Sequence, residues 1–85
     1  METKVALIGI VVENFDSVKK LNDILHAYGD VIIGRMGIPY KMRGVSIMSI
    51  AVDATEDTIS AMAGKIGKLP GISSKTVYAK MGDNI

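Results

Sequence analysis

The chain has 85 residues, of which 48% are hydrophobic and 5% aromatic, and it contains no cysteine. Its 10 basic and 9 acidic residues are spread along the chain and give a net charge of +1. These values exclude a disulfide-stabilised core, a thiolate metal site and a basic tail that binds nucleic acid. They favour one small domain over residues 1–85, with a core of aliphatic side chains and methionine.

No apolar run in the chain approaches the roughly 20 residues that a membrane-spanning helix needs. The run near the start covers only residues 5–12, and no small-residue cleavage site follows it. We therefore expect a cytoplasmic protein without a membrane partner.

The first predicted strand, Val5–Val12, is apolar on both of its sides. A strand with one face in water alternates apolar and polar residues with a period of two. Helices of the same chain can cover one face of this strand, but 85 residues leave little chain to cover the other. We therefore predict a homo-oligomer, a dimer or a tetramer, in which another subunit covers the second face.

A helix is predicted after this strand, with Asn14, Asp16 or Ser17 as the residue that caps it. The next segment, Asp30–Tyr40, has the period of a strand and is interrupted by two glycines, which indicates a bulge or a close backbone approach. The helix predicted between these two strands has a buried stripe that contains Val18, Leu21, Leu25 and Tyr28, with Ile24 beside them.

The third predicted strand, Val45–Val52, is again mostly apolar on both sides. A second helix follows, with Thr55 as its cap, and it ends before Pro70. The last predicted strand, Ile72–Met81, carries more polar residues and is typical of a sheet edge.

The order β-α-β-β-α-β predicts an α+β, ferredoxin-like sandwich, in which two helices cover one face of a four-stranded antiparallel sheet. The first and third strands are central in this arrangement, and they are the two strands that are apolar on both sides. We expect the oligomer interface to use apolar residues of these strands, namely Val5, Leu7, Ile8, Ile10, Met48 and Ile50.

The residues that usually carry chemistry are few. His26 is the single histidine and lies on the polar side of the first predicted helix, so we expect neither a metal site nor a cofactor. The acidic residues Asp53, Glu56 and Asp57 suit the start of a helix, and no serine pairs with His26 at a readable spacing. Both helices are nearly neutral, so we expect no direct nucleic-acid binding.

Four stretches, Ile8–Asn14, His26–Asp30, Ile33–Tyr40 and Lys65–Gly71, resemble the small regulators that are encoded with iron-only hydrogenase systems. The resemblance covers nearly the whole chain, and the run Gly-Arg-Met-Gly-Ile-Pro is its most specific part. It implies an ACT-like fold, similar also to the C-terminal domain of nickel-responsive regulators. Both relatives are oligomeric sensors.

The resemblance also implies where a ligand would bind. A nickel site needs histidines and a cysteine that this chain lacks. ACT domains hold amino acids beside the turn between the first strand and the first helix, at a subunit interface. By this resemblance Glu13, Asn14 and Asp16 would bind an amine or another polar ligand, although the turn lacks the glycine that such turns often have. Arg35 of a neighbouring subunit would then meet a carboxylate.

The sequence thus predicts a non-enzymatic, oligomeric regulatory module of a hydrogenase system, which acts through a small ligand or a protein partner. One alternative is an oligomerisation scaffold without a ligand. Others are an amino-acid-binding sensor of the ACT type and an enzyme whose site forms between subunits.

Overall fold

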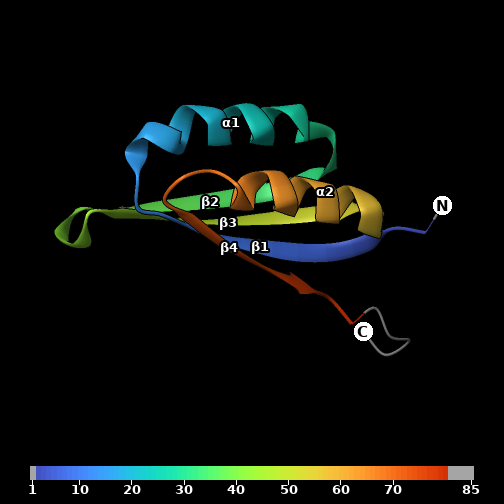
Figure 1. Cartoon of the computed structure of the whole chain (residues 1–85). Coiled ribbons are helices and arrows are strands. Elements are labelled where there is room, and N and C mark those ends of the chain that lie inside the picture. Colours follow the sequence, from blue (N-terminus) through green and yellow to red (C-terminus); the bar gives the residue numbers. More distant parts are fainter. Residues whose placement is uncertain (1, 81–85) are drawn as a thin grey trace.

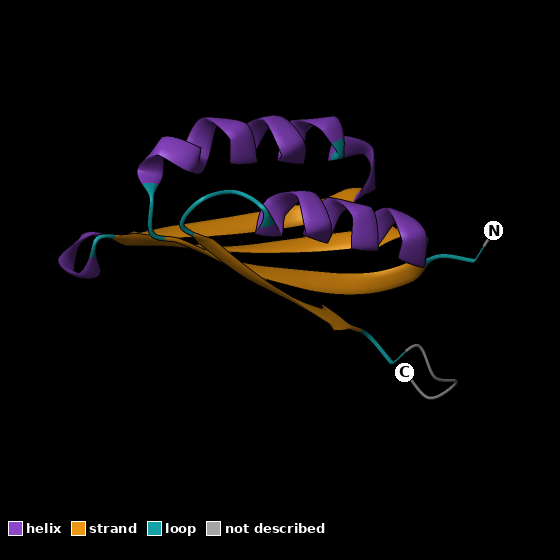
Figure 2. Cartoon of the chain, viewed as in Figure 1, coloured by secondary structure: helices purple, strands orange, loops and turns teal. Residues whose placement is uncertain are grey.

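The computed structural model describes residues 2–80, which form one antiparallel sheet and two helices. The sheet order is β2-β3-β1-β4, and both helices lie on the same side of the sheet (Figure 1 and Figure 2). This arrangement confirms the predicted α+β, ferredoxin-like fold. In chain order the elements are β1 (Lys4–Val12), α1 (Val18–Ala27), β2 (Ile32–Tyr40), β3 (Val45–Ala54), α2 (Glu56–Gly67) and β4 (Ile72–Tyr78).

Three short 3-10 turns, at Phe15–Ser17, Gly29–Val31 and Lys41–Arg43, lie between these elements. The second of them explains why β2 starts at Ile32 rather than at the predicted Asp30. A register shift between Ile32 and Gly34 confirms the predicted bulge in this strand.

Two strand ends also differ from the prediction. β3 continues two residues further than predicted, to Ala54, because Ala54 pairs with Lys4 at the start of β1. β4 ends at Tyr78, and the predicted end at Met81 lies outside the described residues.

The core lies between the sheet and the two helices. Buried side chains from alternate positions of β1 and β3 meet the apolar stripes of α1 and α2 there, as the period of two requires. Its fully buried members are Ile8, Ile10, Val12, Leu21, Leu25, Ile50, Val52, Ile59, Met62 and Ile66. This layer is packed entirely by the chain itself.

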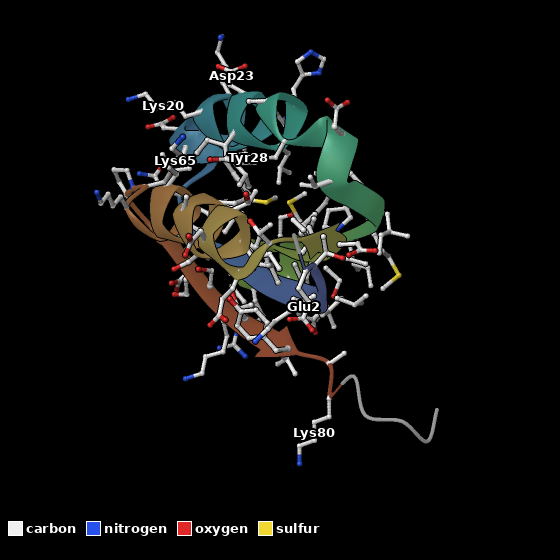
Figure 3. All side chains as sticks on the ribbon, turned by 90° about the vertical axis from the view of Figure 1, so that its right-hand side faces the viewer. Glu2, Lys20, Asp23, Tyr28, Lys65 and Lys80 are labelled. Atoms are coloured by element: carbon white, nitrogen blue, oxygen red, sulfur yellow. The ribbon has the colours of Figure 1, made fainter. Side chains whose placement is uncertain are left out.

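The helix starts follow from local hydrogen bonds. Thr55 caps α2 as predicted, because its side-chain oxygen accepts a hydrogen bond from the backbone N–H of Thr58 at 3.2 Å. Asn14 caps the 3-10 turn that precedes α1, by accepting a hydrogen bond from the Asp16 N–H at 2.9 Å. The two helices also meet through a cation–π contact, in which the Lys65 Nζ lies 5.2 Å from the centre of the Tyr28 ring (Figure 3).

Candidate functional site on the open sheet face

The side of the sheet that faces away from both helices, here called the open face, has no covering element among the described residues (Figure 1). Directly paired strand residues share a face, so the register assigns each side chain to one side of the sheet. The large apolar side chains on the open face, between 37% and 62% exposed, are Leu7, Val11, Met36, Ile38, Tyr40, Ile47 and Val77.

The predicted interface residues divide between the two faces. Val5 and Leu7 lie on the open face, as an interface requires. Ile8, Ile10 and Ile50 are 0–1% exposed in the core, and Met48 packs partly buried against that core. Assigning these four residues to an intersubunit surface was therefore wrong, because the chain's own helices cover them.

The open face is almost free of charge. Among the residues of the four strands, Asp53 and Lys75 are the charged side chains on this side. Lys75 lies on the edge strand β4, and Asp53 lies next to the last residue of β3. Because both lie at the border, the centre of the face has only apolar and small residues to offer a partner.

A shallow depression of about 430 Å³ lies on the sheet where Gly9, Ser49 and Ser73 expose little side chain. Val11 and Ile47 rise beside it. The open face is therefore not flat and has a hollow at its centre.

The turn between β1 and α1 carries the predicted ligand residues Glu13, Asn14 and Asp16. The α2–β4 turn packs against it: the Glu13 N–H donates to the Gly71 carbonyl at 2.7 Å, and Gly71 has a positive φ of 69°. A Cβ at Gly71 would collide with Asn14. The side chain of Asn14 accepts a hydrogen bond within the turn, so it serves the local structure first.

Arg35 lies elsewhere, in an open polar groove of about 880 Å³ between α1 and β2. Its Nη2 donates to the Asn22 Oδ1 at 3.5 Å, and Asp23 and Asp30 line the same groove. Between residues 2 and 80 no ion pair includes Arg35. Arg35 therefore does not lie at the β1–α1 turn of its own chain. A contact between Arg35 and the β1–α1 turn of a neighbouring subunit stays a prediction.

The described part of the chain holds no group of three His, Asp or Glu residues arranged to bind a metal ion. His26 is exposed on α1, beside the Arg35 groove. None of the described helices is both long enough and apolar enough to span a bilayer.

The sequence-based prediction missed most of the open face. Met36, Ile38, Ile47 and Val77 were not among its interface residues, although the alternation along β2 and β3 shows which residues share a side. The missing information was which side the helices cover, because both sides of the central strands are apolar.

Comparison with known proteins supports the same fold. The uncharacterized protein TM1266 from Thermotoga maritima has a similar structure, with a TM-score of 0.89 and 30% sequence identity over 93% of this chain and 100% of that one. An unknown protein from Galdieria sulphuraria shares the fold, with a TM-score of 0.63 and 16% identity over 98% of this chain and 49% of that one. A search of proteins with curated descriptions found no match.

A family model adds a role to this fold. The model is described as "TM1266-like: Iron-only hydrogenase system regulator, putative", and it matches residues 4–76. This range covers all four stretches that carried the resemblance in the sequence, including Lys65–Gly71. The chain belongs to the TM1266-like family of iron-only hydrogenase system regulators.

Proposed function

We propose that this chain is a non-enzymatic regulatory module of an iron-only hydrogenase system and that it acts as a homo-oligomer on a protein partner. The family description supports the regulatory role. The observation that carries the oligomeric part is the open face, where seven large apolar side chains are 37–62% exposed. Contiguous apolar patches of this kind on monomeric proteins mark interaction sites.

A second copy of the chain is the occupant that this face fits best. A standard interface buries roughly 800 Å² per partner, and the open face offers seven large apolar side chains across all four strands to such an interface. The centre of the open face lacks charges, as the cores of homodimer interfaces do, and its charged residues lie at the border. The helix side and the Arg35 groove stay accessible in such an assembly, which leaves them free for a protein partner.

A genetic experiment tests the regulatory role. Deleting the gene in its native host should change hydrogenase activity or transcript level, and the wild-type gene should restore it. Leu7→Asp places a charge on the open face, so this variant should not restore regulation, whereas Lys20→Gln on α1 should restore it fully. Unchanged hydrogenase output in the deletion strain would overturn the proposal.

The Arg35 groove favours a second function, the sensing of a small ligand. The groove presents a guanidinium that has no ion pair within residues 2–80, and it also presents the carboxylate of Asp30. Such a pair suits a molecule with one carboxylate and one ammonium group. A ligand that binds only the native state raises the melting temperature, so thermal-shift measurements with amino acids and metal ions test this function.

The thermal-shift measurements also separate two ligand sites. If the groove binds the ligand, Arg35→Gln removes the shift and Glu13→Gln leaves it intact. If the ligand lies at the β1–α1 turn of an oligomer, as the ACT resemblance implies, both variants reduce the shift. No shift with any compound supports the ligand-free scaffold.

A further inference from the structure

We infer that two copies of the chain pair through their open faces about a two-fold axis that runs parallel to the strands. In this arrangement β1 lies over the partner's β3, and β2 lies over the partner's β4. The inference rests on the proposed homo-oligomer and adds its geometry. The charge of Lys75 on the open face selects the axis, and the sizes of the side chains fit it.

The strand register arranges the open face as three rows that cross the sheet. Each row takes one residue from each strand, in the order β2, β3, β1, β4. The first row is Ile38, Ile47, Val11 and Ser73; the second is Met36, Ser49, Gly9 and Lys75; the third is Gly34, Ala51, Leu7 and Val77.

The rows differ in where their large and small side chains lie. The middle row has two small residues at its centre, where the depression of about 430 Å³ lies. Each outer row has a large residue at one end and a small residue at the other. The first row runs from Ile38 on β2 to Ser73 on β4, and the third row runs from Gly34 on β2 to Val77 on β4. Packed sheets lie about 10 Å apart with interdigitated side chains, so a large residue needs a small one across the interface.

A two-fold axis between two faces keeps the strands of the two packed sheets aligned when it runs along the strands or across them. The axis along the strands keeps the rows and exchanges the edges, so it places Ile38 over the partner's Ser73 and Val77 over the partner's Gly34. Leu7 then lies over the partner's Ala51. These three contacts join a large residue to a small one, as interdigitation requires, while Val11 lies over the partner's Ile47. An axis across the strands makes an equal number of large-to-small contacts, so side-chain size fits both axes and charge decides between them.

The charged residue on β4 separates the two axes. An axis across the strands places Lys75 over the partner's Lys75, and like charges that face each other across an interface are unfavourable. An axis along the strands places Lys75 over the partner's Met36, where the lysine methylenes pack and the ammonium reaches solvent at the sheet edge. The charge therefore favours the axis parallel to the strands.

Cross-linking tests this geometry while Lys75 stays in place. The natural chain has no cysteine, so single introduced cysteines react alone. We would mix Ile38→Cys with Ser73→Cys, and in a second sample Ser73→Cys with Val77→Cys, and treat both with a short bismaleimide that spans the sheet spacing. Circular dichroism of each variant shows whether it folds, and light scattering of the wild type reports its oligomeric state.

The inference predicts that a mixed cross-linked dimer forms between Ile38→Cys and Ser73→Cys. It predicts that no mixed dimer forms between Ser73→Cys and Val77→Cys. The reverse result places the axis across the strands and overturns the inference, while the homo-oligomer stands. An oligomeric wild type with no cross-link in either sample also overturns it, because the open face is then not the interface. A monomeric wild type rejects the proposed oligomer itself.

Discussion

The two faces of this sheet are built from the same strands and nearly the same residue types, yet they differ in what covers them. On the helix side Ile8 and Ile50 are fully buried by α1 and α2. On the open side Leu7 and Ile47, which belong to the same two strands, are 45% and 43% exposed. The helix side thus supplies the stability of one chain, and the open side is available for association.

Because the two faces are covered differently, folding and assembly can be perturbed separately in this domain. Substitutions on the helix side should lower the free energy of unfolding at every protein concentration. Substitutions on the open side should act mainly through the oligomer, whose stability depends on concentration.

The largest effect is expected for Ile8→Asp. This change buries a carboxylate with no partner, which exceeds the stability that a domain of this size has available. Leu7→Asp is its control, because the adjacent residue points to the open side. We expect circular dichroism to show an unfolded Ile8→Asp chain and a folded Leu7→Asp chain, and equal loss of structure in both would contradict the assignment of the two faces.

A smaller effect is expected from a cavity in the core. Ile50→Ala should lower the free energy of unfolding by about 2–5 kcal/mol, as truncations of fully buried aliphatic residues do. Ile47→Ala, in the same strand, removes the same atoms from the open side. Urea denaturation at two protein concentrations checks the pair: the Ile50→Ala loss should be independent of concentration, and the Ile47→Ala loss should appear only where the wild type is associated.

The cap of α2 gives a prediction of about 1 kcal/mol. Thr55→Ala removes the oxygen that accepts a hydrogen bond from the Thr58 N–H, so it should lower the free energy of unfolding by about 1 kcal/mol. Thr55→Ser keeps the acceptor and should remain close to the wild type. Because the cap lies away from the open face, the dissociation constant of the oligomer should not change, and a weaker oligomer in Thr55→Ala would show that the two faces are coupled.

The smallest effect concerns Lys4, at the start of β1. A hydrogen bond from its ammonium to the Glu56 carboxylate 3.0 Å away, helped by the charge of Glu56, raises the pKa of Lys4 above its ordinary value of 10.5. A raised lysine pKa stabilises the fold below pH 10.5, and this stabilisation is lost as the pH rises through the folded-state pKa. Glu56→Gln should return the pKa of Lys4 towards 10.5 in an NMR titration; an unchanged pKa would rule out Glu56 as the cause.

Much of the fold was predictable from local patterns. The caps at Asn14 and Thr55, the bulge in β2 and the strand order all follow from residue type and spacing. The 3-10 turn Phe15–Ser17 was not predictable. Ser17 stands at the N-cap position of α1, but its side chain makes no capping hydrogen bond, and its Oγ instead donates to the distant Pro70 carbonyl at 2.7 Å. A contact between two turns so far apart in sequence leaves no signal in either one.

The candidate site was predictable only in part. Two apolar sides on β1 indicate that both faces are covered, but they do not say which side the helices take. Ile8 and Leu7 are therefore equivalent in the sequence and opposite in the structure. Arg35 was proposed as a ligand residue through the ACT resemblance, whereas the groove that contains it depends on the position of α1 above β2, which no local pattern records.

The mass of the native protein in solution tests the central claim most directly. The chain has a mass of 9.1 kDa. If a second copy covers the open face, light scattering after size exclusion should give at least twice this mass at micromolar concentration, and Leu7→Asp should give a folded species of 9.1 kDa. A wild-type protein that stays at 9.1 kDa under these conditions, with no apolar ligand bound, would contradict the account.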